Sequence, residues 1–402
     1  MMNCSDTPLE DYWEYQLSQN IYKYGGIILL VIGIIGNVLS MIVLLRKKFR
    51  TTTTGVYLFA LSVTDCTVII WAQFLRHALR GLTGIDLPNQ YPWFCKLWYF
   101  IIKVTTTASG WLLAALTIER VLGIYMPLKW RIYSTTQNAR IGIIAIYISL
   151  AGINMHYFWS YGPVYITDEK NITTKATGCS ISTDDSNLEH FMLNYRPTMD
   201  LITRTFLPFA VIAIGNIMII FKLKKQLRTR DHLTQSKNEF QKIDKYGAEN
   251  VCVEMIGYRQ ALCDYRNISN TEINTISKKA MYETNSTSSM VSLTSNMRTP
   301  KNHRDSVDKM TLMLISASIN YILLVAPMAI MYLIEPYNPG DTRICPDANA
   351  QHALIWSCLL FVFYTNFCAN FFMYCASGKQ FRDEIMNILQ GVSKKTQQVV
   401  IS

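Results

Sequence analysis

The sequence predicts an all-α membrane protein, a seven-transmembrane helix bundle with a short amphipathic helix after the last span. Two observations predict this class. Hydrophobic residues make up 50% of the chain and arrive in long blocks, whereas a soluble domain would distribute them at helical or strand spacing. Several blocks also reach the roughly 20 residues that a helix needs to cross about 30 Å of hydrocarbon.

Seven blocks are long enough to span a bilayer. We expect them at Ile21–Leu45, Gly55–Leu79, Cys95–Tyr125, Ala139–Tyr161, Met199–Lys225, Asp308–Glu335 and Ala350–Cys375. The expected organisation is an outer N-terminal segment (1–20), the bundle (21–377), and an amphipathic helix with a tail (378–402).

The charge distribution predicts the topology. Residues 1–20 are polar and acidic and lack the apolar core of a cleavable signal peptide. Basic residues gather in alternate connections, beginning with Arg46, Lys47 and Lys48, as the positive-inside rule requires. We therefore expect an extracellular N-terminus and a multi-pass protein of the plasma membrane. The net charge of +10 then reports topology, and we expect no nucleic-acid partner.

The longest connection, 226–307, is polar and rich in Ser, Thr, Asn and Lys. It contains too few apolar residues to form a domain, so we predict a disordered cytoplasmic loop. After the last span, Phe381 and Ile385 alternate with charged residues. That pattern is typical of a short amphipathic helix lying along the membrane lipid.

Several polar residues fall inside the expected spans, where a charged side chain costs about 2.5–3.5 kcal/mol on insertion scales. They are Asn37, Asp65, Ser109, Asn366 and Asn370. Two interpretations are open. These side chains form packing hydrogen bonds between helices, which we favour for Asn37, or they form a site, and for Asp65 we favour an inward-facing carboxylate that binds a cation or a proton.

Short motifs along the spans resemble those of the rhodopsin-like G-protein-coupled receptors, in the same order. They are Gly36-Asn37, Leu61 with Asp65, Glu119-Arg120-Val121, Pro208, Pro327, Asn370-Phe371-Phe372-Met373-Tyr374 and Phe381-Arg382. These motifs, at family spacing along the chain, leave little room for chance. The resemblance implies a receptor that activates a heterotrimeric G protein and is not an enzyme.

The resemblance also implies roles for single residues. In such receptors, residues matching Asp65, Ser109, Asn366 and Asn370 surround an allosteric sodium ion; no other cofactor is implied. Glu119 would hold Arg120 by a charge-assisted hydrogen bond at rest, although a snorkelling arginine is the alternative. The residues implied in activation and G-protein contact are Glu119, Arg120, Leu128, Tyr321, Pro327, Asn370 and Tyr374.

Cysteines and glycan acceptors divide by membrane side. Cys95 and Cys179 match the outer disulfide of the family, and Cys4 with Cys345 is a possible second bridge. The pattern Asn-X-Ser/Thr marks Asn171, and Asn3 more weakly, as glycosylation sites. On the cytoplasmic side, the Ser/Thr-rich stretch Thr284–Thr299 suggests phosphorylation by receptor kinases and arrestin docking.

Two absences narrow the ligand class. Tyr364 stands where an opsin carries its retinal lysine, and Ile102 stands where an amine receptor carries its aspartate. A peptide, a lipid or another small non-amine molecule remains. We favour a peptide because the outer connection 163–198 is long and the 366–382 segment resembles invertebrate neuropeptide receptors of the FMRFamide-like kind.

The expected pocket lies in the outer third of the bundle. Its candidates are Gln73, Lys103, Thr106, Asp200, Arg204, Tyr332 and Tyr364. Asp200 and Arg204 are four apart and share a helix face, so they either contact the ligand or neutralise each other. Acidic outer loops favour a basic ligand, whereas Arg76 and Arg80 favour an acidic one, and the sequence does not decide.

The chain departs from the family pattern at four positions. Val325 replaces the aromatic switch of the sixth span, where Tyr321 can take over part of the role. Phe371 replaces a proline, Tyr147 a tryptophan, and Val307 an acid. These changes leave open a receptor-like scaffold that no longer signals. A seven-helix transporter is the other alternative, although the inverted repeats typical of that class are not visible.

Overall fold

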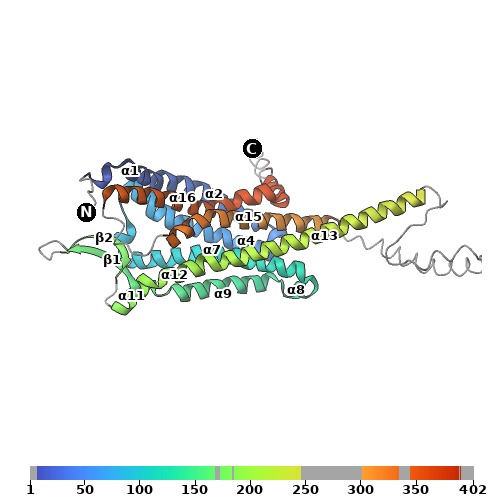
Figure 1. Cartoon of the computed structure of the whole chain (residues 1–402), viewed down its shortest axis with the longest axis horizontal. Coiled ribbons are helices and arrows are strands. Elements are labelled where there is room, and N and C mark those ends of the chain that lie inside the picture. Colours follow the sequence, from blue (N-terminus) through green and yellow to red (C-terminus); the bar gives the residue numbers. More distant parts are fainter. Residues whose placement is uncertain are drawn as a thin grey trace, which may run out of the picture. The chain divides into compact units, whose positions relative to one another are not determined.

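The structure is a computed structural model that describes residues 7–167, 173–182, 185–245, 301–334, 345–388 and 390. The chain divides into two units, Leu223–Asp308 and the remainder. The remainder contains a bundle of helices that are long and apolar enough to cross a membrane (Figure 1). The seven candidate spans are Trp13–Leu44, Thr53–Thr83, Pro92–Tyr125, Thr136–Ser160, Arg196–Gln226, Leu314–Leu333 and Pro346–Ser377. The predicted fold class is thereby confirmed.

Each span consists of one or more helical elements. In chain order they are α1 (Trp13–Asn20), η2 (Ile21–Gly25) and α2 (Gly26–Leu44); α4 (Thr53–Val68), η3 (Ile69–Ala78) and α5 (Leu79–Thr83); α7 (Pro92–Tyr125); α9 (Thr136–Asn154) and α10 (Tyr157–Ser160); α12 (Arg196–Leu201), η4 (Ile202–Phe206) and α13 (Leu207–Lys245); α15 (Lys301–Ile334); and α16 (Pro346–Ser377).

A short element, η1 (Leu9–Asp11), precedes the first span. The elements between spans are α3 (Lys47–Arg50), α6 (Leu87–Gln90), α8 (Pro127–Tyr133), β1 (Tyr161–Thr167), β2 (Thr173–Ile181) and α11 (Ser186–Asn194). Side-chain caps start several helices: Thr52, Thr135 and Asp185 each accept a hydrogen bond from a backbone N–H of the first turn. Such caps satisfy donors that the helix itself leaves unpaired.

Several boundaries differ from the sequence prediction. Helix α15 begins at Lys301, whereas the prediction placed residues 301–307 in the disordered loop. The first span begins at Trp13, because α1 and η2 continue α2 toward the N-terminus. The fifth-span helix α13 continues to Lys245, whereas the prediction assigned everything from Gln226 to a disordered loop. Residues 226–245 contain no glycine or proline, so no residue with a strong penalty in a helix interrupts the element. Residues 246–300 lie outside the described part of the chain.

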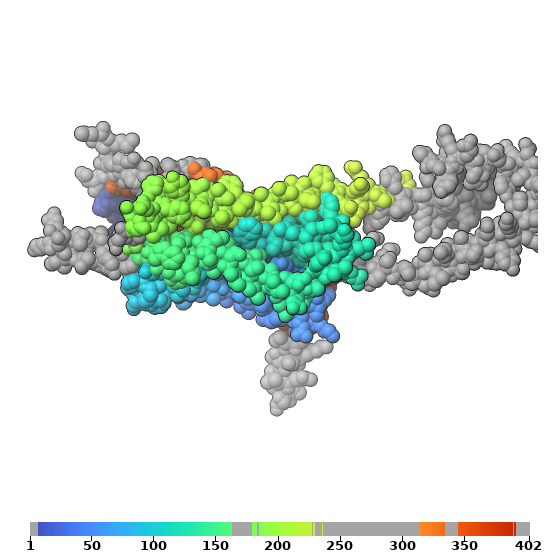
Figure 2. All heavy atoms as spheres, turned by 90° about the horizontal axis from the view of Figure 1, so that it is seen from below, coloured from blue at the N-terminus to red at the C-terminus, as the bar shows by residue number. Residues whose placement is uncertain are grey.

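The bundle surface carries the apolar stripes expected of lipid-facing helices. On α9 the exposed side chains Ile141, Ile144 and Ile148 recur at helical spacing, which places them on one face. Figure 2 shows this side of the molecule, along which α9 runs in green. In a membrane, these three isoleucine side chains would contact hydrocarbon.

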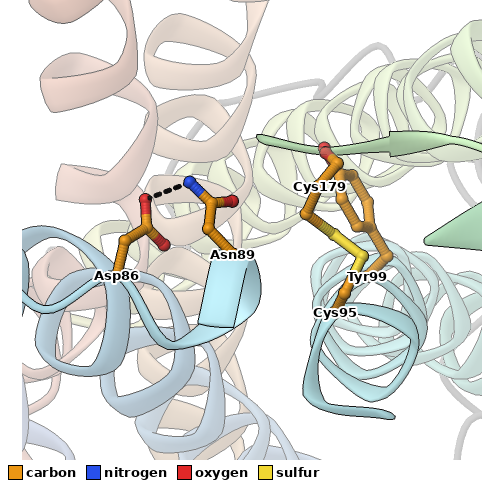
Figure 3. The surroundings of a disulfide bond; sticks show 5 residues. All are labelled: Asp86, Asn89, Cys95, Tyr99 and Cys179. Atoms are coloured by element: carbon orange, nitrogen blue, oxygen red, sulfur yellow. Dashed lines mark hydrogen bonds between the residues drawn. A yellow bond between two sulfur atoms is a disulfide. The ribbon is translucent and has the colours of Figure 1, made fainter. Parts of the chain in front are cut away.

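The β-hairpin is fixed to the third span by a disulfide. Strands β1 and β2 pair antiparallel, with Pro163 opposite Cys179. Cys179 is bonded to Cys95 in the first turn of α7, with Cα atoms 5.8 Å apart (Figure 3). One turn along α7, the Tyr99 hydroxyl donates to the Cys179 carbonyl at 3.3 Å. The disulfide expected from the family resemblance is therefore present. We call this end of the bundle the hairpin end.

The other cysteine and glycan predictions fall largely outside the described residues. Cys345, which precedes α16, is disulfide-bonded, and its expected partner Cys4 lies outside the described residues. Asn3, Asn171 and Thr284–Thr299 lie outside them as well.

The predicted amphipathic helix is present, since residues 379–388 are helical. Phe381 is 1% exposed, and its ring packs edge-on against Phe49, Phe371 and Tyr374. Arg382 donates hydrogen bonds to two carbonyls in the last turn of α16, which satisfies acceptors at that helix end. The helix is thus bound to the bundle through Phe381 and Arg382.

Candidate functional site

A cavity of about 480 Å³ opens among the spans at the hairpin end. This volume lies in the range of pockets that hold small ligands. The walls come from six spans. The lining residues are Gln19, Tyr22, Lys23, Arg76, His77, Arg80, Gly81, Trp98, Tyr99, Ile102, Lys103, Thr106, Arg204, Met328, Tyr332, Trp356, Leu360, Phe363 and Tyr364.

Each π-helical segment in the described part of the chain contributes to this cavity. η2 carries Tyr22 and Lys23, η3 carries Arg76 and His77, and η4 carries Arg204. π-helical turns are frequent at functional sites. The concentration of these segments around one cavity marks it as the candidate ligand site.

The cavity contains five of the seven ligand-contact candidates predicted from the sequence: Lys103, Thr106, Arg204, Tyr332 and Tyr364. The other two are not among the lining residues. Gln73 is 4% exposed and faces a smaller hollow beside Gly26. Asp200 lies behind Lys103, with both carboxylate oxygens occupied by protein groups.

Asp200 is the centre of a polar network that joins three spans. Its Oδ2 lies 3.0 Å from Lys103 Nζ, and its Oδ1 lies 2.8 Å from Arg196 Nη2. Arg196 also donates to Asn154 at 2.8 Å, and the Tyr157 hydroxyl donates to Asp200 at 3.3 Å. The pairing of Asp200 with Arg204, one of the two sequence interpretations, is not formed. Arg204 instead stacks its guanidinium over the Tyr332 ring at 5.2 Å.

Aromatic side chains make up much of the cavity wall, and the sequence prediction missed most of them. The Arg76 guanidinium lies 4.5 Å from the Trp98 ring centre, and the Trp98 indole N–H donates to the Trp71 carbonyl at 2.9 Å. Tyr22 stacks on His77 at 4.8 Å. Trp98 lies four and eight residues before Ile102 and Thr106, so helical spacing alone could have placed it on the same face.

The hairpin adds a neutral aromatic group next to the network. Tyr161 packs against Tyr99 and Tyr157, with ring centres 4.3 and 4.8 Å apart. Burial raises the pKa of the Tyr161 phenol. Tyr161 therefore contributes no charge to this end of the bundle.

A second polar cluster lies in the middle of the bundle. Asp65 is fully buried, and its two oxygens accept hydrogen bonds from the Ser109 hydroxyl at 2.9 Å and the Asn370 amide at 2.7 Å. Asn366 lies one turn before Asn370 on α16 and is 2% exposed. The structure thus brings residues from the second, third and seventh spans together around one carboxylate.

Asn37 behaves as the packing interpretation predicted. Its amide donates to the Phe367 carbonyl at 2.8 Å and to the Gly33 carbonyl at 3.0 Å. These bonds hold the first span against the seventh.

The expected charge-assisted hydrogen bond between Glu119 and Arg120 is not formed. The Glu119 carboxylate accepts hydrogen bonds from the hydroxyls of Thr53 and Ser134, and it forms no ion pair with Arg120 within the described structure. Arg120 Nε is buried without a hydrogen-bond partner there. Because the two residues are adjacent on one helix, their side chains point in different directions. Glu119 therefore reaches the hydroxyls of Thr53 and Ser134.

Tyr321 occupies the core between the third, fifth and sixth spans. Its hydroxyl lies 2.3 Å from where a Cβ on Gly110 would stand, and Pro208 is 3.5 Å from the same point. Its ring packs edge-on against Phe209 at 5.3 Å. Gly110 therefore makes room for Tyr321, which stands one turn before the Val325 position where the family carries its aromatic switch.

The remaining departures from the family pattern have structural counterparts. The Tyr147 hydroxyl is hydrogen-bonded to the Thr64 hydroxyl, which joins the fourth span to the second. α16 runs without interruption through Phe371, as expected where proline is missing. Leu128 on α8 is 86% exposed.

The family described as "7 transmembrane receptor (rhodopsin family)" matches residues 36–374 of the chain. The chain belongs to this family. The match confirms the resemblance seen in the motifs and the expectation of a receptor rather than an enzyme, and it favours the receptor over the transporter alternative.

Several peptide receptors are similar to this receptor. The FMRFamide peptide receptor frpr-18 of Caenorhabditis elegans is 26% identical over 223 residues, 55% of this chain and 50% of that protein. Galanin receptor 2b of Danio rerio is 26% identical over 223 residues, 54% of each chain. The FMRFamide receptor of Drosophila melanogaster is 29% identical over 215 residues, 52% of this chain and 38% of that protein. The alignments thus span about half the length, or less, of these relatives.

Proposed function

We propose that the chain is a plasma-membrane receptor, with its N-terminus outside, that binds an extracellular peptide and activates a heterotrimeric G protein. The observation that carries this proposal is the separation of two sites along one rhodopsin-family bundle. The cavity lies at the hairpin end, and Glu119-Arg120 lies near the opposite end of α7. The peptide class is supported by the names of the relatives, which include FMRFamide and galanin receptors.

Ligand binding would act on the relative positions of the spans. A ligand in the cavity contacts Lys103 on α7, Arg204 in η4 and Tyr332 on α15 at the same time. If it binds one arrangement of these spans better than another, it shifts the population by that difference in affinity. Tyr321 and Pro327 precede the cavity residue Tyr332 on α15. A shift of α15 caused by a ligand at Tyr332 would therefore also move Pro327 and Tyr321.

At the opposite end, Arg120 and Leu128 are the proposed contacts for the G protein. Glu119 is held by Thr53 and Ser134, so Arg120 can change position without first breaking an ion pair with its neighbour. Tyr374 is fully buried and lies against Phe381. We assign Asn370 and Tyr374 to the same transition because α16 carries both.

The mid-bundle cluster fits a sodium ion. The donor set consists of oxygen atoms, which sodium prefers: the Asp65 carboxylate, the Ser109 hydroxyl and the Asn366 and Asn370 side-chain carbonyls. Ser109 and Asn370 each donate a hydrogen bond to Asp65, and all four residues are buried. A bound cation would neutralise the buried carboxylate of Asp65. We assign these residues a resting-state role on that ground.

The proposal extends to processing and regulation. Glycans at Asn3 and Asn171 and a Cys4–Cys345 bridge would stand on the ligand side. Phosphorylation within Thr284–Thr299 by receptor kinases, followed by arrestin binding, would end signalling. The helix at 379–388 would lie at the inner lipid surface.

The test is second-messenger output from cells that express the full chain at their surface. A panel of amidated and free-acid neuropeptides is applied beside amines and lipids. A saturable response to a peptide, lost in Arg120→Ala at equal surface expression, is the expected result. A response to amines or lipids alone would refute the peptide class, and silence to every class at confirmed surface expression would refute the signalling function.

A further inference from the structure

The cavity at the hairpin end is strongly cationic. Five basic side chains line it, and no acidic side chain of the described residues does so. The basic residues are Lys23, Arg76, Arg80, Lys103 and Arg204. Charges next to protein are weakened less than charges in bulk water, so this imbalance acts on whatever enters the cavity.

The nearby carboxylates do not balance these charges. Asp200 is shared between Lys103 and Arg196, which leaves that group with one excess positive charge. Asp86 pairs with Arg80 at 3.3 Å. Both carboxylates are therefore engaged by cations that outnumber them.

Arg76 is the cation best placed for a ligand. Its guanidinium stacks on Trp98, 4.5 Å from the ring centre, and it forms no ion pair within the described structure. The Trp98 ring is itself fixed by the hydrogen bond to the Trp71 carbonyl. Stacking uses one face of the guanidinium and leaves the N–H donors at its edge, which match the two oxygens of a carboxylate.

We propose that this cavity recognises a carboxylate on the ligand, held by Arg76, with an aromatic or apolar side chain of the ligand beside it. This inference rests on the proposed peptide-receptor function and names the chemistry of the peptide. Trp98, Trp356 and Tyr364 supply the aromatic surface. The carboxylate belongs either to an acidic side chain or to a free C-terminus.

The test compares small probes that differ only in charge, on the purified full-length receptor. N-acetyl-phenylalanine presents a terminal carboxylate, and N-acetyl-aspartyl-phenylalaninamide presents a side-chain carboxylate. N-acetyl-phenylalaninamide and N-acetyl-asparaginyl-phenylalaninamide are their neutral counterparts. The measurement is the rise in the receptor's unfolding temperature with probe concentration, because a ligand stabilises the state that it binds.

We expect at least one acidic probe to bind roughly tenfold more tightly than its neutral counterpart, the difference that one charge-assisted hydrogen bond supplies. The probe that shows the preference identifies the source of the carboxylate. Arg76→Gln should abolish the preference, while Arg76→Lys, which keeps the charge but loses the paired donors of the guanidinium, should retain only part of it. Arg131→Gln, the same change at an exposed position on α8, is the matched control and should leave it unaltered.

Equal or weaker binding of both acidic probes, absence of binding by all four, or a preference that persists in Arg76→Gln would overturn the inference. If Arg76→Gln does not fold, Arg76→Lys is compared with the parent. Lysine lacks the paired donors of the guanidinium, so an unchanged affinity for the acidic probe would count against Arg76. Failure of the proposed receptor function would give a different result. The purified receptor would then still prefer the acidic probe, but cells expressing it would respond to no peptide of either charge.

Discussion

Asp200→Asn should destabilise the receptor more than removal of either cation that it binds. Asp200 faces Lys103 at 3.0 Å and Arg196 at 2.8 Å, so the substitution leaves two cations beside a neutral amide. The side chains of Asp200 and Arg196 are 13% and 7% exposed, and breaking such a buried pair by removing one partner costs about 3–5 kcal/mol.

Lys103→Met is the matched comparison. It leaves Asp200 with Arg196 and the Tyr157 hydroxyl, so the loss is one hydrogen bond between charged groups, about 1.5–3 kcal/mol. Lys103 is also 21% exposed, which places its loss at the lower end. In the double variant Asp200→Asn/Lys103→Met only Arg196 remains unpaired, and Asn154 still accepts from it. The double variant should therefore lose less than the sum, by about 0.5–3 kcal/mol.

The assay is the thermal unfolding of the solubilised receptor, which needs no ligand, together with surface expression in the same cells. We expect the order of stability to be parent, Lys103→Met, double variant and Asp200→Asn, with the last two close together. The reasoning would be refuted if Lys103→Met cost as much as Asp200→Asn, or if the two losses simply added in the double variant.

Three further changes test other contacts by the same thermal assay. Gly110→Ala places a Cβ 2.3 Å from the Tyr321 hydroxyl and should cost about 1–3 kcal/mol by overpacking; a smaller loss is expected in a Tyr321→Phe background, and an equal loss would show that the hydroxyl is not the obstacle. Cys95→Ser opens the bond to Cys179 and should cost about 2–5 kcal/mol, with surface expression falling accordingly; unaltered expression and stability would contradict this. Tyr147→Phe removes a hydrogen bond between spans and should cost about 0.6 kcal/mol, so a loss above 2 kcal/mol would point to a larger role for the hydroxyl.

The sequence was sufficient for the spans because transmembrane helices are selected by length and hydropathy alone. It was also sufficient for the Cys95–Cys179 bridge and the Asp65 cluster, since both are carried by motifs at family spacing. The end of α13 was predicted wrongly because the polarity of residues 226–245 suggested a loop. These residues contain no glycine or proline, which permits a helix, and the prediction did not use this.

The pairing of charges in the cavity was not predictable from helix spacing. Asp200 has a cation four residues away on either side, Arg196 and Arg204, and spacing cannot say which one it binds. Packing against the third and fourth spans decides, because Lys103 on α7 and Asn154 on α9 stand on the side of Arg196. The same limit applies to Glu119, whose partners Thr53 and Ser134 are remote in sequence.

The aromatic wall shows a second limit of sequence reasoning. Trp98 could be placed by helical spacing from Ile102, but Tyr22 and Trp356 stand on other spans and look like any aromatic residue of a helix core. Their place at the cavity depends on how the first and seventh spans pack, and in part on the π-helical turn of η2.

The most direct test of the two-site account measures peptide binding and G-protein nucleotide exchange in the same membranes, once an agonist is known. Tyr332→Ala at the cavity should weaken peptide binding yet leave maximal exchange at saturating peptide near the parental level. Arg120→Ala should bind the peptide with little loss and drive no exchange. If Tyr332→Ala bound normally, or if Arg120→Ala still drove full exchange, the account of one ligand cavity and a separate G-protein contact would be contradicted.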